Sequence, residues 1–126
     1  MGKHLQSQGI SLDAILCSTA VRARETASGF LKEYTFEGEV LYYDDLYQAD
    51  PATIMAALRQ LPEQVETAMV IGHNPGLDDF LELVCDESEH MPTACIAHIK
   101  FQIEQWVDLH ENTQGEVVHF WKVREI

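Results

Sequence analysis

One short segment, residues 70–76 with the sequence VIGHNPG, constrains the fold of this chain most. The residues before it, 67–71, form an apolar run without a turn former, which predicts a short buried strand. Pro75 suits the first position of a helix, because its missing N–H costs nothing there, and Gly76 lets the backbone approach closely. His73 is therefore expected at the carboxyl end of a strand, beside a helix N-terminus. Ligands of open α/β sheets bind at such places, and anions are favoured.

A structural histidine, hydrogen-bonded to the backbone at the end of a strand, would fit the same position. The alternative is a histidine that handles phosphate or acyl groups, and evidence from the rest of the chain is needed to distinguish the two interpretations. The other histidines show no HxxxH or HxH pairing, so we expect no metal site and no cofactor. They are His4, His90, His98, His110 and His119.

Strands and helices alternate through the first two thirds of the chain. The patterns predict helices over 2–8, 20–33, 51–61 and 77–85, and strands over 13–17, 39–43 and 67–71. Gly9 is expected to end the first helix, Ser18 or Thr19 to cap the second, and Asp50 to cap the third. This order predicts an α/β fold with a mostly parallel sheet and helices on both faces.

The last third of the chain has a different pattern. Residues 93–103 and 117–123 read as strands, and residues 112–115 read as the turn between them. We expect these two strands to pair as a C-terminal antiparallel hairpin at the edge of the sheet. With 126 residues, the chain is expected to form a single domain, 1–126.

Composition limits the possible partners. The net charge is −13, with 21 acidic residues against eight lysines and arginines, which disfavours nucleic acid and anionic membranes as partners. No apolar run approaches the length of a membrane span and no leader sequence begins the chain, so we expect a cytoplasmic protein. Cys17, Cys85 and Cys95 lack metal-ligand spacing and lie in apolar stretches, which predicts buried free thiols in a reducing compartment. A catalytic cysteine is the alternative, and the absence of a basic context disfavours it.

A second constellation lies at residues 17–27, with the sequence CSTAVRARETA, where another strand becomes a helix. Arginine in the first turn of a helix is electrostatically misplaced unless an anion binds there. Guanidinium groups and backbone N–H groups would then point at the same anion. We expect Arg22 to face the site and Arg24 to pair with a carboxylate on the surface. Two solvated surface arginines would produce the same spacing.

Together the two constellations resemble a known family. Residues 17–27 resemble the Ser-Pro-x-x-Arg-Ala-x-x-Thr-Ala segment of the histidine phosphatase superfamily, and residues 70–76 resemble its second histidine motif. Leu46-Tyr47 followed by Pro51, and residues 91–94 (MPTA), are similar to the SixA-type phosphohistidine phosphatases. The resemblance extends from Gly2 to the C-terminus. It implies a three-layer, phosphoglycerate mutase-like fold.

The resemblance also implies a mechanism and a set of site residues. In the family, a histidine of an N-terminal Arg-His-Gly motif accepts the phosphoryl group, and water then releases it. By position, Arg22 would be the second phosphate-binding arginine and His73 the second histidine, with Asn74 as a further phosphate ligand. The general acid would come from Asp44, Asp45 or Asp50. The implied substrates are a phosphorylated protein, above all one carrying phosphohistidine, or a small phosphomonoester.

The sequence departs from the family at its start, because residues 1–126 contain no Arg-His-Gly. By the family pattern, the first strand and the nucleophile would precede Met1, so we expect a domain that is incomplete at its N-terminus. The chain as written is then not expected to turn over substrate. It is either part of a longer phosphoric monoester hydrolase or a non-catalytic domain that binds phosphorylated ligands. An unrelated α/β domain is a third alternative.

Overall fold

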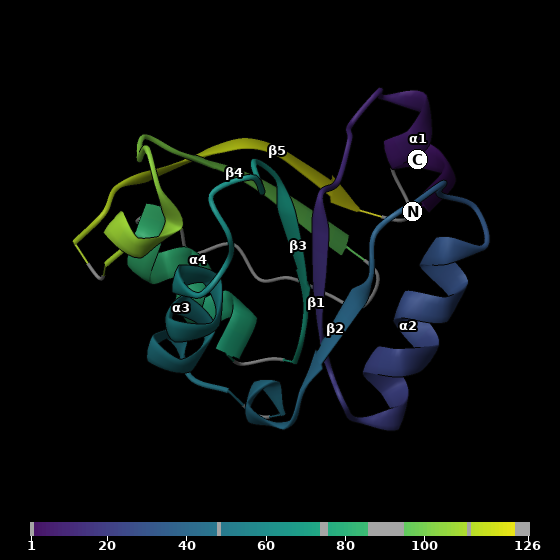
Figure 1. Cartoon of the computed structure of the whole chain (residues 1–126), viewed down its shortest axis with the longest axis horizontal. Helices are drawn as coiled ribbons and strands as arrows, with labels where there is room; N and C mark the ends of the chain where they lie inside the picture. Colours follow the sequence, from purple (N-terminus) through teal and green to yellow (C-terminus); the bar gives the residue numbers. More distant parts are fainter. Residues whose placement is uncertain (1, 48, 74–75, 86–94, 111, 123–126) are drawn as a thin grey trace.

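Helices and strands alternate along the first part of the chain, as Figure 1 shows for the computed structural model. The structure describes residues 2–47, 49–73, 76–85, 95–110 and 112–122. The elements in these residues are α1 (Gly2–Ser7), β1 (Ala14–Ser18), α2 (Val21–Leu31), β2 (Val40–Tyr43), the 3₁₀ helix η1 (Asp44–Leu46), α3 (Pro51–Arg59), β3 (Ala68–Ile71), α4 (Gly76–Cys85), β4 (Cys95–Phe101), the 3₁₀ helix η2 (Trp106–Asp108) and β5 (Gly115–Lys122). The predicted elements are present, with bounds that differ by a few residues.

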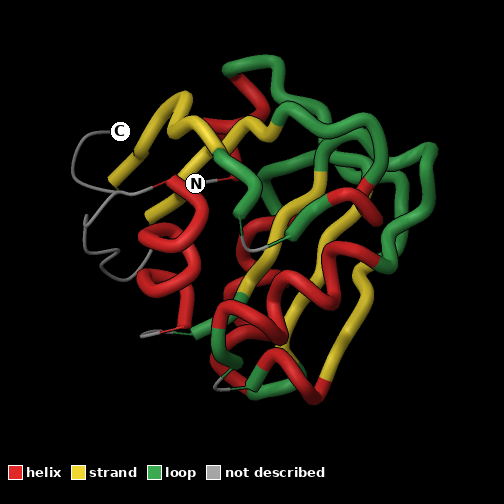
Figure 2. The backbone as a smooth tube through the Cα atoms, turned by 90° about the vertical axis from the view of Figure 1, so that its left-hand side faces the viewer, coloured by secondary structure: helices red, strands yellow, loops and turns green. Residues whose placement is uncertain are grey.

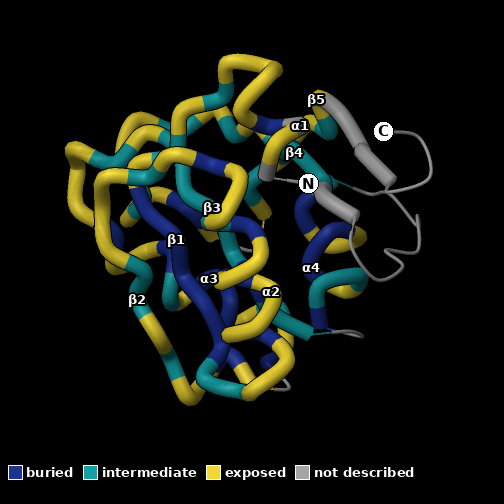
Figure 3. The backbone as a smooth tube through the Cα atoms, turned by 90° about the vertical axis from the view of Figure 1, so that its right-hand side faces the viewer, coloured by how far each residue is buried: buried dark blue, intermediate teal, exposed yellow. Residues whose placement is uncertain are grey.

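Strand β1 is the centre of a three-stranded parallel sheet with the order β2-β1-β3. Every residue of β1 is buried, because helices cover both faces of the strand. Figure 3 shows this continuous buried segment. Its side chains alternate between two cores, since successive residues of a strand point to opposite faces. The predicted three-layer α/β arrangement is confirmed.

The two cores lie on opposite faces of the parallel sheet. The α1/α2 core consists of Leu5, Ile15, Cys17, Ala23, Ala27, Phe30, Tyr34 and Ile71. The α3/α4 core consists of Ala14, Leu16, Leu46, Ala49, Ile54, Met55, Leu58, Leu61, Phe80, Val84 and Leu109. Fully burying one large aliphatic or aromatic side chain contributes about 1.5–3 kcal/mol. These clusters are therefore the main source of the stability that holds the sheet and its connecting turns in place.

Strand β3 has an open edge. In the described residues it pairs with β1 on one side, and β4 pairs with β5 in a separate antiparallel sheet. Figure 2 shows the two hairpin strands as a pair apart from the parallel strands. Ala68 and Val70 pack against the α3/α4 core while Met69 and Ile71 pack against the α1/α2 core, yet only Ile71 is buried and the other three are partly exposed. Since both faces of β3 are covered, the remaining exposure comes through its open edge.

The hairpin differs from its predicted place and bounds. We expected it at the edge of the parallel sheet, but in the described residues β4 and β5 form a two-stranded sheet of their own. Strand β5 begins at Gly115, which we had assigned to the turn. A Cβ at Gly115 would approach the side chains of Ile99 and Phe101 to 2.9 Å, so glycine permits the close packing of the strands here. Residues 93–94 of the predicted strand lie outside the described residues.

Local signals correctly placed two helix boundaries and misplaced a third. Gly9 follows α1 with a φ of 71°, a conformation that glycine adopts without strain. The Asp50 side chain accepts a hydrogen bond from the Thr53 N–H at 2.9 Å and caps α3. The predicted cap of α2 by Ser18 or Thr19 is wrong, because the N-cap is Ala20 and no side chain caps there.

Candidate functional site

The candidate site lies where β1 and β3 end at the same edge of the sheet. The two strands are parallel and in register, with Cys17 opposite Ile71. Strand β1 continues into α2, and β3 continues through Gly72 and His73 toward α4. Two helices thus begin at the carboxyl edge of the sheet (Figure 1). This is the usual place for ligands in open α/β sheets.

His73 is held at this edge by three contacts. Its Nε2 lies 2.9 Å from the Oγ of Ser18, the last residue of β1. Its backbone carbonyl accepts a hydrogen bond from the Leu77 N–H at 3.1 Å, in the first turn of α4. The ring of Tyr47 stands edge-on to the imidazole, with 5.4 Å between ring centroids and an interplanar angle of 74°. The Ser18 contact joins the turn after β3 directly to the end of β1.

The first turn of α2 differs in charge from the first turn of α4. It contains no acidic residue, and its N-cap residue, Ala20, contributes no side-chain hydrogen bond. The first turn of α4, in contrast, contains Asp78 and Asp79. Arg22 is exposed, and its guanidinium makes no hydrogen bond or ion pair with any residue that the structure describes. The positive end of the α2 dipole and the Arg22 charge are therefore not neutralised by nearby carboxylates of the same turn.

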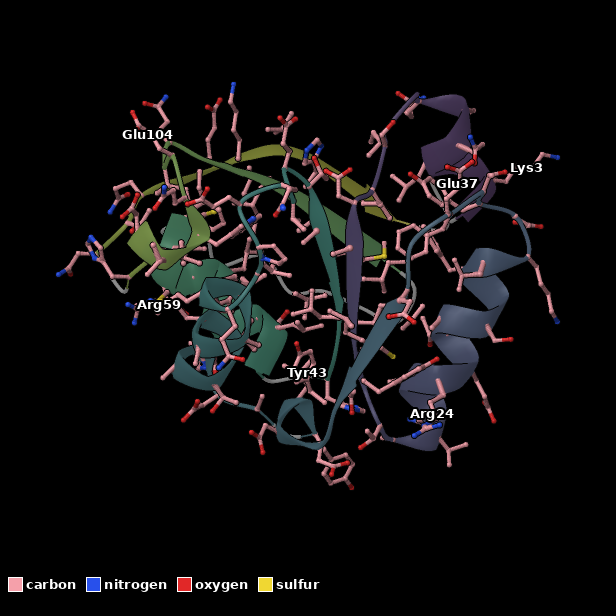
Figure 4. The ribbon with its side chains drawn as sticks, in the orientation of Figure 1. Lys3, Arg24, Glu37, Tyr43, Arg59 and Glu104 are labelled. Atoms are coloured by element: carbon pink, nitrogen blue, oxygen red, sulfur yellow. The ribbon has the colours of Figure 1, made fainter. Side chains whose placement is uncertain are left out.

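Arg24 has a different role from the predicted one. Instead of pairing with a carboxylate, its Nε donates a hydrogen bond to the Thr19 carbonyl oxygen at 2.8 Å. Its guanidinium carbon lies 4.8 Å from the centroid of the Tyr42 ring, in a cation–π arrangement. Thr19 in turn donates from Oγ1 to the Asp44 Oδ1 at 2.7 Å. Figure 4 shows Arg24 at the start of α2. These contacts connect the β1–α2 turn to β2 and η1.

The three candidate general acids occupy different environments. Asp50 is the cap of α3, and hydrogen bonds from the Thr53 backbone and side chain lower the pKa of its carboxyl. A carboxyl held ionised in this way is poorly suited to donate a proton. Asp44 is exposed and linked to the β1–α2 turn through Thr19, whereas Asp45 is exposed beside it. The assignment of an acid to Asp44 or Asp45 stays a prediction.

Cys17 does not have the environment of a nucleophile. Its side chain is fully buried, and burial raises the pKa of the thiol, an effect that the charge of Arg24 opposes in part. The Sγ donates a hydrogen bond to the Ser18 carbonyl oxygen at 3.2 Å. A protonated, inaccessible thiol cannot attack a substrate. Cys17 and the half-buried Cys85 are both outside disulfides.

Within the described residues, no three histidine, cysteine or acidic side chains come together in a way that could hold a metal ion. None of the helices in these residues is both long and apolar enough to traverse a bilayer.

Sequence reasoning placed His73 at the strand end and missed the residues around it. The sequence predicts Ser18 as a helix cap, whereas its side chain contacts the histidine. Leu46-Tyr47 is part of the family resemblance, but that resemblance does not predict the contact of Tyr47 with His73. The sequence signal that could have identified Ser18 as a site residue is its position, because it is a polar residue at the end of an otherwise apolar strand. Asn74, the further phosphate ligand implied by the resemblance, lies outside the described residues.

Comparisons with known proteins place this geometry in context. No protein-family model matches the sequence. Uncharacterized proteins of Mycobacterium leprae and of Mycobacterium tuberculosis are 35% identical to the chain over 74 residues. These residues are 59% of this chain and 44% of each relative, so the match spans less than half the length of the relatives.

Solved structures match over nearly the whole chain. The putative phosphohistidine phosphatase SixA from Nakamurella multipartitia has a TM-score of 0.83 and 25% identity, covering 96% of this chain and 76% of that one. The putative phosphohistidine phosphatase SixA from Agrobacterium tumefaciens has a TM-score of 0.79 and 21% identity, covering 96% and 74%. A protein histidine phosphatase SixA complexed with tungstate has a TM-score of 0.78 and 20% identity, covering 94% and 74%. These matches confirm the predicted phosphoglycerate mutase-like fold.

Proposed function

We propose that this chain, which has the fold of the SixA-type histidine phosphatases, handles phosphoryl groups at the carboxyl edge of β1 and β3. The observation that carries the proposal is the 2.9 Å contact between His73 Nε2 and Ser18 Oγ. It brings the histidine turn against the turn that leads into the arginine-bearing start of α2. A histidine, an arginine and a helix N-terminus free of acidic residues form a suitable cradle for a tetrahedral oxyanion. One structural neighbour is described as a complex with tungstate, an oxyanion of this kind.

In this proposal, Arg22 and His73 bind the phosphoryl oxygens, with Asn74 as a further ligand. Arg22 is exposed and has no competing partner among the described side chains, so it is available to a ligand. Preorganised donors of this type also stabilise the charge that spreads over the oxygens during phosphoryl transfer. The substrate is a phosphorylated protein, above all one carrying phosphohistidine, or a small phosphomonoester.

We further propose that the nucleophilic histidine is delivered by a strand that pairs with the open edge of β3. Both faces of β3 are covered by the two cores, so the edge suits an extended apolar segment. A strand running parallel to β3 on that edge would end beside His73, since parallel strands present their carboxyl ends at one edge. Residues 1–126 contain no Arg-His-Gly. By themselves they are then expected to bind phosphate without hydrolysing an ester.

The first experiment is a titration of inorganic phosphate into the ¹⁵N-labelled 126-residue chain, followed by NMR. We expect shifts at residues 18–26 and 72–76, and loss of binding in Arg22→Ala and His73→Ala. Arg59→Ala is the matched control, because Arg59 is an exposed arginine on α3, across the sheet from Arg24 (Figure 4). If phosphate leaves both segments unperturbed, the phosphate site is refuted.

The alternative function, a non-catalytic domain that binds phosphorylated ligands, is favoured by the lack of a family nucleophile in residues 1–126. The test is hydrolysis of p-nitrophenyl phosphate by the 126-residue chain and by a form extended upstream. Activity confined to the extended form supports the phosphatase, provided that Arg22→Ala and His73→Ala abolish it. Binding of phosphate without activity in either form supports the binding domain.

A further inference from the structure

Ser18 is an unusual residue in the core of this protein. Its side chain is completely buried, at 0% exposure, and no other short polar side chain in the described ranges is classed as buried. A buried hydroxyl destabilises the folded state unless its hydrogen-bonding groups are satisfied. An alanine would fill nearly the same space without that requirement. The hydroxyl must therefore be understood through its two partners.

The two partners determine where the hydroxyl proton goes. The Ala20 N–H donates to Ser18 Oγ at 3.2 Å, which occupies one of the two lone pairs of the oxygen. The other partner is His73 Nε2 at 2.9 Å. If Nε2 carried the proton of the neutral imidazole, it would donate to Oγ. The proton of Ser18 would then lack an acceptor among the described residues, and Ser18 itself has no surface exposed to water.

The opposite arrangement satisfies every group. Ser18 donates its proton to Nε2, and it still accepts the Ala20 N–H. In a neutral imidazole one nitrogen is a donor and the other an acceptor, so the proton must then be on Nδ1. The half-buried ring has Nδ1 as its remaining polar atom, and the Tyr47 contact further limits its rotation.

We propose that Ser18 is a positioning residue that fixes neutral His73 in the tautomer with its proton on Nδ1. Nδ1 is thereby kept as the hydrogen-bond donor that His73 offers to a bound oxyanion. The other tautomer would present an acceptor lone pair to the anion and repel it. The second part of this inference rests on the proposed function, because it takes phosphate as the anion. The tautomer itself does not depend on it.

The experiment determines the protonated nitrogen of His73 in the unliganded, ¹⁵N-labelled 126-residue chain. Long-range ¹H–¹⁵N correlation spectra, recorded at a pH where the ring is neutral, distinguish an N–H nitrogen from a bare one. We expect a bare Nε2 and a protonated Nδ1 in the wild-type protein. Finding the proton on Nε2 overturns the proposal, and this result needs no variant that has to fold.

Two variants test whether Ser18 causes the tautomer. Ser18→Ala should allow a substantial population of the Nε2-protonated form, and Ser18→Thr, which keeps a hydroxyl, should retain the wild-type tautomer. Ser11→Ala is the matched control, because Ser11 is an exposed serine before β1. If folded Ser18→Ala keeps Nδ1 as fully protonated as wild-type, Ser18 does not determine the tautomer.

Phosphate binding separates this inference from the proposed function. Ser18→Ala should weaken phosphate binding about two- to tenfold, the usual effect of one lost hydrogen bond. Phosphate that fails to bind the wild-type chain refutes the phosphate site, and the tautomer of the unliganded chain still decides the role of Ser18. Phosphate that binds to a chain with Nε2 protonated refutes only the positioning role.

Discussion

Gly76 offers a sharp test of how the histidine turn is built into the fold. It is buried at the first position of α4, and a Cβ at this position would collide with the carbonyl oxygen of Ala49. That oxygen belongs to the backbone just before the Asp50 cap of α3, so it cannot swing aside as a side chain would. Gly76→Ala therefore requires the start of α4 to move away from the start of α3.

The size of the effect follows from two opposing contributions. Alanine favours a helix over glycine by about 1 kcal/mol. Overpacking against a backbone atom should cost about 3 kcal/mol, the upper part of the usual range. Gly76→Ala should thus lower the free energy of unfolding by about 2 kcal/mol, which corresponds to a Tm decrease of about 6–10 °C in a domain of this size. The assay is thermal and urea unfolding followed by circular dichroism.

Gly29→Ala is the matched control. Gly29 is exposed within α2, and nothing lies within 4 Å of a Cβ added there. The same substitution should raise the free energy of unfolding by about 0.5–1 kcal/mol. If the two variants change Tm in the same direction and by similar amounts, the packing of Gly76 on Ala49 does not constrain the turn, and this reasoning is refuted.

Three other predictions concern single side chains. Hydrogen bonds lower the pKa of Asp50, so its ionised form stabilises the fold above the ordinary Asp pKa of about 4, and this contribution is lost as the pH falls through the lower folded value. The stability advantage of wild-type over Asp50→Asn should therefore shrink in urea titrations below about pH 4, and an advantage independent of pH would contradict the assignment. Tyr34→Phe should lower the free energy of unfolding in urea by about 1–3 kcal/mol, because the buried hydroxyl accepts a hydrogen bond from the Leu12 N–H and donates one to the Ile10 carbonyl. Tyr42→Phe, at an exposed position, should lower it far less. Cys17 should react with iodoacetamide only in denaturant, as measured by peptide mass spectrometry; rapid labelling of the native protein would show that it is accessible.

Residue patterns were sufficient to predict the helices and strands and their arrangement in layers. Apolar runs and helical periodicity located the strands and helices, and the Asp50-Pro51 pair located the start of α3, because these signals act over a few neighbouring residues. Family resemblance added the fold. Contacts between segments that are distant in the sequence could not be predicted from these local patterns. The Ser18–His73 contact depends on the register of β1 with β3, and the Arg24 contacts depend on how β2 lies beside α2.

The same limit explains the errors. Ser18 and Thr19 are good helix caps, but each has a stronger partner elsewhere in the fold, His73 for one and Asp44 for the other. Glycine is common in turns, and only the packing of Gly115 against Ile99 and Phe101 places this residue in a strand. In each case a tertiary contact overrode a local preference.

The two cores differ in when their parts become available during synthesis. All members of the α1/α2 core lie between Leu5 and Ile71, whereas the α3/α4 core requires Leu109. Because synthesis proceeds from the N-terminus, every member of the α1/α2 core leaves the ribosome before Leu109 and the C-terminal hairpin do. Ser18 ends β1, the central strand of the sheet, and His73 lies two positions after Ile71, the last member of the α1/α2 core. Mutations in the C-terminal third should consequently reduce the yield of folded protein. They should have less effect on the geometry of the Ser18–His73 contact in the protein that does fold.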